Sequence, residues 1–200
     1  MSQRITKIKV ILIGESGVGK TNLINVSIGQ DFNEQEQTTF SSSFVEKEFE
    51  IDKKLYVLNI WDTIGQEKFR NLTKLFFKDS KIVILVYDKS QIETFTALNY
   101  WSNQVKECLG DDIILAIIGN KEDLDESPND VNMEEARDYS ENLNAKFRLV
   151  SAKENPKGFI SFLKELLIDY INKYYNKNVG NNDKVVLDKK TIKKKKKSKC

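Results

Sequence analysis

Residues 8–21 read IKVILIGESGVGKT, and this stretch decides the fold. The run Ile8–Ile13 is short and nearly all apolar, which is typical of a strand buried on both faces. Gly14–Thr21 follows and matches the pattern G-x-x-x-x-G-K-[ST]. Its glycines let the backbone curl, so that several N–H groups and the start of the next helix face an anion. The stretch therefore predicts a phosphate-binding loop between a central strand and a helix.

The remaining chain alternates strands with helices. Short apolar or alternating runs predict five further strands, two of which form an antiparallel hairpin around Asp52-Lys53-Lys54. The alternation predicts an α/β domain with a six-stranded, mostly parallel sheet, one antiparallel strand and helices on both faces. Ligands of such sheets bind beyond the carboxyl ends of the strands. The further strands are predicted at Phe44–Ile51, Leu55–Trp61, Ile82–Tyr87, Ile113–Ile118 and Phe147–Val150. The helices are predicted at Asn22–Ile28, along the apolar stripe from Phe95 to Cys108, after the capping pair Asn132 and Glu135, and from Pro156 to Ile171.

The composition excludes several kinds of chemistry. The 200 residues contain no histidine, which rules out Ser-His-Asp catalysis and a zinc helix of the H-E-x-x-H type. Two cysteines cannot form a four-thiolate metal site, and we expect Cys108 to be a small buried hydrophobe. The longest apolar runs have six residues, whereas a membrane span needs about 20. With no signal-peptide pattern at the start, we expect the protein to stay in the cytosol.

Charge divides the chain into two parts. Residues 177–200 contain ten lysines and two aspartates, a net charge of +8, so residues 1–176 carry −6 of an overall +2. The tail is polar and has no aromatic residue, which is typical of a segment that is disordered by itself. We therefore interpret residues 1–176 as one folded domain and residues 177–200 as a polybasic tail ending in Cys200.

The loop at Gly14–Thr21 is expected to hold the polyphosphate of a nucleotide. In this motif Lys20 supplies a point charge for the β- and γ-phosphates, and the Thr21 hydroxyl is a ligand for Mg²⁺. A chance match in a glycine turn is the alternative, which the strand before the loop and the helix after it disfavour. The predicted contacts are Glu15, Ser16, Gly17, Val18, Gly19, Lys20, Thr21 and Asn22.

A second motif, WDTIGQE at residues 61–67, follows a predicted strand. Asp62 would stand at the carboxyl end of that strand and hold Mg²⁺ through water. The Gly65 N–H would face the γ-phosphate, and Gln66 would orient the attacking water. Alone this stretch is typical of a turn at the end of a strand, whereas together with the phosphate loop it becomes a specific signal for these roles.

Two further motifs point to guanine. In NKED, residues 120–123, the Asp123 carboxylate accepts from the ring N–H and the exocyclic amino group of guanine, whereas adenine offers no such pair. An acceptor left unpaired costs about 1–3 kcal/mol, so the wrong base is also penalised. Ser151-Ala152-Lys153 follows the last predicted strand and would bring the Ala152 N–H to the base carbonyl. The nucleotide contacts predicted in these two motifs are Asn120, Lys121, Asp123, Ser151, Ala152 and Lys153.

With these motifs in order across residues 7–175, the chain resembles the small GTPases of the Ras superfamily, and among them the Rab family. The segment IWDTIGQEKFRNLT, residues 60–73, is the most Rab-like. The resemblance implies a P-loop GTPase fold with GTP or GDP and Mg²⁺ as cofactors. It also implies that Phe32 packs against the base, that Lys121 lies along the nucleotide, and that Thr39 closes over Mg²⁺ and the γ-phosphate.

Three features depart from the Rab pattern. Residues 40–44 read FSSSF where a run like isoleucine-glycine is expected, so the strand that effectors read is unusual. Ile64 replaces the usual alanine in the second switch, and we hypothesise altered nucleotide exchange or hydrolysis. The chain ends in one cysteine, Cys200, where Rab proteins more often carry two.

The resemblance implies an enzyme that hydrolyses GTP, with Gln66 and Lys20 as its catalytic residues. None of the four arginines stands where the family would use one in catalysis, so we expect slow intrinsic hydrolysis that needs an activating protein. The other implied partners are an exchange factor, a GDP-dissociation inhibitor or escort protein, and effectors. The protein is expected to be a monomer that regulates vesicle-mediated membrane traffic.

The tail is expected to hold the protein at the cytosolic face of intracellular membranes. Lys193–Lys197 and Lys199 would attract an anionic leaflet, and a prenyl chain on Cys200 would supply the second anchoring signal. A solvated charge run and a nuclear-import patch are the alternatives. The acidic domain and the absence of aromatic residues from the tail argue against nucleic acid as a partner.

Two other functions compete with a hydrolysing switch. A GTP-binding scaffold that does not hydrolyse would follow if the unusual switches no longer close. An ATP-using phosphotransferase would share the phosphate loop, but the NKED segment argues against it.

Overall fold

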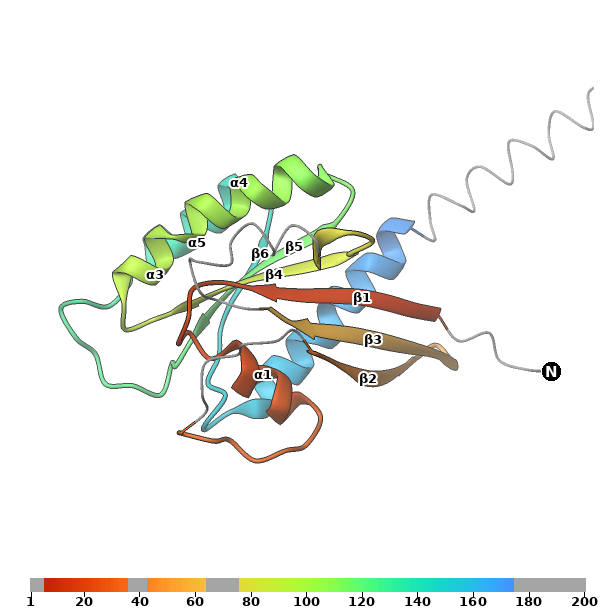
Figure 1. Ribbon diagram of the computed structural model, residues 1–200, viewed down its shortest axis with the longest axis horizontal. Helices are drawn as coiled ribbons and strands as arrows, with labels where there is room; N and C mark the ends of the chain where they lie inside the picture. The colour runs from red at the N-terminus through yellow and green to blue at the C-terminus, as the bar shows by residue number, and fades with distance from the viewer. Residues whose placement is uncertain (1–5, 36–42, 64–75, 175–200) are drawn as a thin grey trace, which may run out of the picture.

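The sheet has the predicted architecture. The computed structural model describes residues 6–35, 43–63 and 76–174. Its strands are β1 (Thr6–Ile13), β2 (Ser43–Ile51), β3 (Lys54–Asp62), β4 (Ile82–Asp88), β5 (Ile114–Asn120) and β6 (Lys146–Leu149). They pair in the order β2-β3-β1-β4-β5-β6 (Figure 1). Only the β2–β3 pair is antiparallel among these strands, which confirms the predicted fold class.

The hairpin between β2 and β3 turns in two residues. Asp52 and Lys53 have φ values of 50° and 61°, the left-handed conformation that a tight hairpin turn needs. The turn pairs Ile51 with Lys54 and puts β2 at the edge of the sheet.

Helices cover both faces of the sheet (Figure 1). The helices are α1 (Lys20–Ser27), α3 (Ile92–Thr96), α4 (Leu98–Leu109), α5 (Met133–Asn142) and a last one that includes residues 156–174. In β1, Val10 and Leu12 pack with α1 and the last helix, whereas Ile11 and Ile13 pack with α4. This double burial explains the nearly continuous apolar run. None of the helices in the described ranges is long and apolar enough to cross a membrane.

The prediction for Cys108 is wrong, because its side chain is exposed. The buried stripe of α4 runs through Trp101 and Val105 and continues four residues on to Leu109, which packs against the same core. A helix turns about 100° per residue, which carries Cys108 off the buried face. Phe95 lies in α3, a separate short helix that meets α4 at Ala97.

The predicted cap of α5 is confirmed. The Asn132 side chain accepts hydrogen bonds from the backbone N–H groups of Glu134 and Glu135, at 2.8 and 3.2 Å. Such a cap satisfies donors that the first turn of a helix leaves unpaired.

β1 lies between β3 and β4 in the sheet. The strands β2 and β3 lie on one side of β1 and the later strands β4 to β6 on the other, so the order of the strands switches sides at β1. Chemistry-bearing residues follow or close the strands at their carboxyl ends: Gly14 after β1, Asp62 in β3, Asp88 in β4 and Asn120 in β5. Open α/β sheets bind their ligands at such a switch point.

Candidate functional site

The phosphate loop connects β1 to α1 and depends on glycine at one close approach. Gly19 has a φ of 92°, and a Cβ atom there would lie 2.3 Å from the Asn120 amide nitrogen. A side chain at this position would push apart two segments that are 101 positions apart in the chain. Because glycine has no Cβ atom, only glycine at position 19 lets the loop backbone approach Asn120 this closely.

Lys20, the first residue of α1, is a buried cation, with 6% of its surface exposed. Its ammonium donates to the Gly14 and Glu15 carbonyl oxygens, at 2.9 and 2.8 Å. Burial lowers the pKa of Lys20 to about 8, against the opposing effects of the Asp62 and Glu15 carboxylates. The loop thus holds a positive charge at the place where the motif requires one.

Thr21 and Asp62 meet although 41 positions separate them. The Thr21 hydroxyl donates to an Asp62 carboxylate oxygen at 2.8 Å, and Asp62 is buried at the end of β3. Both groups offer the hard oxygen atoms that Mg²⁺ prefers, and Mg²⁺ usually takes one or two protein ligands beside substrate phosphates. Within the described ranges no three His, Cys, Asp or Glu residues gather into a metal site. The pair fits a magnesium ion that is shared with phosphates.

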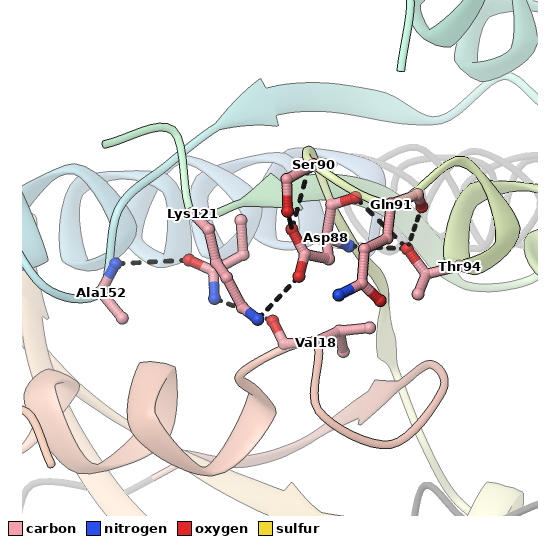
Figure 2. A network of polar contacts seen from close by, with 8 residues as sticks. Val18, Asp88, Ser90, Gln91, Thr94, Lys121 and Ala152 are labelled. Atoms are coloured by element: carbon pink, nitrogen blue, oxygen red, sulfur yellow. Dashed lines mark hydrogen bonds and ion pairs between the residues drawn. The ribbon is translucent and has the colours of Figure 1, made fainter. Parts of the chain in front are cut away.

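Asn120 ties the base loop to the phosphate loop. Its amide nitrogen donates to the Val18 carbonyl oxygen at 2.9 Å, and its oxygen accepts from the Ala152 N–H at 3.3 Å (Figure 2). Asp123 is fixed nearby, because the Ser151 hydroxyl donates to its carboxylate at 2.5 Å. The structure thus brings together three motifs that were predicted separately.

Phe32 and Asn22 lie beside this site. The Asn22 side chain donates to the Asn33 carbonyl oxygen at 2.9 Å and accepts from the Asn33 N–H at 3.0 Å. This clamp holds the segment that carries Phe32, whose half-buried ring packs against the core. Lys153 is exposed, 3.6 Å from a carboxylate oxygen of Glu34. Such an exposed pair contributes little to stability.

Two residues of this region were missed by the sequence reasoning. The buried Asp88 carboxylate lies 2.7 Å from the Lys121 ammonium, and the Trp101 indole N–H donates to the Glu15 carboxylate at 3.0 Å. The signal for Asp88 was its place at the carboxyl end of a predicted buried strand. No signal in the sequence predicts the contact of Trp101 with Glu15. The spacing of apolar residues in α4 predicts only that Trp101 is buried in the core.

Several predicted residues lie outside the described residues. These are Thr39, Ile64, Gly65, Gln66 and Cys200, with the tail and most of residues 40–44.

An aromatic cluster lies close in the chain to residues 36–42 and 64–75. Phe44 on β2 stacks on Trp61 of β3 with ring centroids 4.9 Å apart, and Phe76 lies 6.2 Å from Trp61. Phe44 is 49% exposed, so the cluster presents an apolar ring at the surface. Contiguous apolar patches on a protein surface often mark binding sites.

Comparisons with known proteins agree with this geometry. The model of the Ras family matches residues 9–171, which include the phosphate loop, Asp62 and the base loop. Ras-related protein Rab-21 of Homo sapiens is 40% identical over 166 residues, covering 83% of this chain and 71% of that protein. Ras-related protein RABG3b of Arabidopsis thaliana is 37% identical over 170 residues, covering 81% and 83%. Ras-related protein Rab7 of Pisum sativum is 38% identical over 128 residues, or 62% of each chain.

Proposed function

The chain belongs to the Ras family, as a Rab-like small GTPase of membrane traffic, and from this premise we propose that its candidate site binds GTP and GDP. One observation carries the proposal: the Asn120 amide joins the base loop to the Val18 carbonyl of the phosphate loop at 2.9 Å. A ligand that engages both loops would carry a polyphosphate on the phosphate loop and a base at the base loop, as a nucleotide does.

The polyphosphate would lie on the loop backbone and the Lys20 ammonium. A buried cation and several N–H groups at a helix start stabilise negative charge more strongly than the same groups do in water. At the other end Asp123, fixed by Ser151, would accept from guanine. The remaining proposed contacts are Glu15, Ser16, Gly17, Gly19, Asn22, Phe32, Thr39, Gly65, Lys121, Ala152 and Lys153.

Thr21 and Asp62, the latter through water, would hold Mg²⁺ together with Thr39. When bound, this ion neutralises phosphate charge and aligns the β- and γ-phosphates. The 2.8 Å hydrogen bond from the Thr21 hydroxyl to an Asp62 carboxylate oxygen supports this proposal, because it places the two oxygen groups side by side.

The direct test is to denature the purified full chain and identify the nucleotide released. We expect GDP or GTP in a molar ratio near one, and competition by GTP but not by ATP for a fluorescent guanine nucleotide. Release of adenine nucleotide, or equal competition by ATP, would favour the phosphotransferase alternative.

Family members hydrolyse GTP, and we propose that this chain does so slowly, with Gln66 orienting the attacking water. The arginines of the described ranges do not contradict this: Arg148 binds Glu165 at 2.6 Å, and Arg137 lies exposed on α5. An activating protein that supplies an arginine would then accelerate turnover, as it does in related switches.

Changing Gln66 to leucine is expected to cut stimulated hydrolysis about 100-fold or more, because the water loses its hydrogen-bond partner. GDP and GTP affinities should stay within about threefold, since Gln66 contributes little to binding in the ground state. Single-turnover hydrolysis with and without an activating protein measures both. Unchanged turnover would contradict the role of Gln66. If the unaltered chain itself binds but never hydrolyses GTP, it acts as a scaffold.

The aromatic cluster of Phe44, Trp61 and Phe76 supports effector binding as part of this function. It joins β2 and β3 just outside residues 36–42 and 64–75, the segments that hold Thr39 and Gln66. A surface in this place can respond to the γ-phosphate, and aromatic side chains dominate the core of protein interfaces. The exchange factor, the activating protein and the dissociation inhibitor would read the same switch segments.

We also propose that the tail anchors the GTPase to membranes through Cys200 and its lysines. A Cys200→Ser chain treated with prenyl transferase should stay unmodified by mass spectrometry. It should also bind vesicles containing phosphatidylserine at least about tenfold more weakly than the treated wild type, since one lipid chain plus basic residues forms the stable anchor. Equal binding of both chains would contradict the role of Cys200 and would indicate that the lysines alone bind the membrane.

A further inference from the structure

Asp88 is a buried carboxylate at the carboxyl end of β4 that faces the base loop. Its side chain is 1% exposed, and the strand register sets it beside Asn120 at the end of β5. One carboxylate oxygen accepts from the Ser90 N–H and hydroxyl, at 2.9 and 2.7 Å, and the other lies 2.7 Å from the Lys121 ammonium. A carboxylate buried this deeply is tolerated only with such partners.

The start of α3 fixes the backbone of Asp88. The Thr94 hydroxyl accepts from the Asp88 N–H at 3.0 Å and donates to the Gln91 carbonyl at 2.7 Å. The Gln91 N–H in turn donates to the Asp88 carbonyl at 3.0 Å. Figure 2 shows these contacts converging on Asp88 from one side while Lys121 reaches it from the other. The carboxylate is therefore a rigid anchor point.

Lys121 is the residue that needs an anchor. Its φ of 65° is rare for a side chain other than glycine or asparagine, so the surrounding contacts must hold it there. The Lys89 N–H donates to the Asn120 carbonyl at 2.9 Å, which joins the same two strand ends through the backbone. A lysine side chain loses much rotamer freedom when it is fixed, and the ion pair with Asp88 imposes that loss before a ligand arrives.

We propose that Asp88 is a positioning residue for the guanine nucleotide: it holds the Lys121 side chain in the place where it lies along the nucleotide, and so slows nucleotide release. The inference rests on the proposed function, because it takes Lys121 as a nucleotide contact. Lys121 belongs to the base loop and not to the phosphate loop. The effect is therefore the same for GDP and for GTP.

The test uses the full chain loaded with fluorescent GDP or GTP and chased with excess unlabelled nucleotide. Asp88→Asn keeps the size of the side chain and removes its charge; we expect nucleotide release about tenfold faster for both nucleotides. Lys121→Met should accelerate release to a similar degree, and the double variant should add less than twofold to either single one, because both changes break the same pair. Glu93→Gln, which neutralises an exposed carboxylate on α3, should release nucleotide at the wild-type rate.

Ser90→Ala is the second variant, because Asp88→Asn disturbs a buried network and can prevent folding. It removes one hydrogen bond to the Asp88 carboxylate, leaves the charge in place, and should speed release about threefold. Release from Asp88→Asn within twofold of wild type, or effects of Asp88→Asn and Lys121→Met that multiply, would overturn the inference. So would an unchanged Ser90→Ala rate if Asp88→Asn does not fold. A wild-type chain that retains no guanine nucleotide would instead overturn the proposed function.

Discussion

Lys20→Met is expected to weaken GDP and GTP binding about 1,000-fold without weakening the fold. In the proposed complex Lys20 would donate charge-assisted hydrogen bonds to two phosphates, each contributing about 2 kcal/mol, and about 4 kcal/mol corresponds to three decades of affinity. Methionine keeps the apolar stem of the side chain that packs in the loop. Titration with fluorescent nucleotide measures the affinity, and thermal melting without nucleotide measures stability.

Stability and binding should respond in opposite directions. The Lys20 pKa falls from 10.5 to about 8 on burial, so the charged form at pH 7 costs the nucleotide-free fold about 3 kcal/mol. The methionine variant is therefore expected to melt no lower than wild type when both are free of nucleotide. Lys164→Met, which removes an exposed lysine from the last helix, is the control and should change neither property. A variant that binds GDP within tenfold of wild type would contradict the role of Lys20.

The same pKa predicts the pH dependence of binding. Above about pH 8 the nucleotide-free protein has lost the Lys20 proton, and binding of phosphate must restore it. The association constant should thus fall as pH rises through 8, by up to tenfold per unit, and be nearly flat below pH 7. The Lys20→Met variant has no ammonium group at this position, so its association constant should not fall in this way as pH rises. Ionisation of the guanine base would change the association constants of the variant and of the wild type alike. Parallel profiles for the two chains between pH 7 and 9 would contradict the assignment.

The sheet was predictable because its causes are local. β1 and β4 are buried on both faces, so their runs are almost continuously apolar, and the glycine pattern after β1 leaves few other ways to connect a strand to a helix. The sequence reasoning erred at Cys108, where spacings of three and four residues compete. Only the packing of Leu109 against the core decides between them.

Contacts between distant segments were less predictable than the motifs themselves. The rule that ligands gather at carboxyl strand ends brings Lys20, Asp62 and Asn120 to one edge, and the structure agrees. The rule does not predict which of these side chains form hydrogen bonds or ion pairs with one another. That Ser151 fixes Asp123, or that Trp101 reaches Glu15 over 86 positions, follows from strand register and helix orientation, which no local pattern encodes.

Asp123→Asn is expected to exchange guanine for xanthine. In the proposed complex the Asp123 carboxylate would accept from two donors of guanine, the ring N–H and the amino group, whereas an amide in its place offers one acceptor beside an unwanted donor. A buried donor or acceptor left unpaired costs about 1–3 kcal/mol, so two such losses predict GDP affinity lower by about 30-fold to about 20,000-fold. Xanthine carries a carbonyl where guanine carries the amino group, and the amide N–H₂ can donate to it. Affinity for xanthosine diphosphate should therefore exceed that for GDP.

The contact with Ser151 makes this exchange testable without disturbing the loop. The serine hydroxyl donates to Oδ1 of Asp123, and the amide oxygen of asparagine can accept the same hydrogen bond. Asp125→Asn, an exposed acidic residue two positions on, is the matched control and should leave the preference for guanine intact. Titrations of both variants with GDP and xanthosine diphosphate measure the preference. If Asp123→Asn still prefers GDP, the base is read by other groups, because the loss of this one carboxylate is then not decisive.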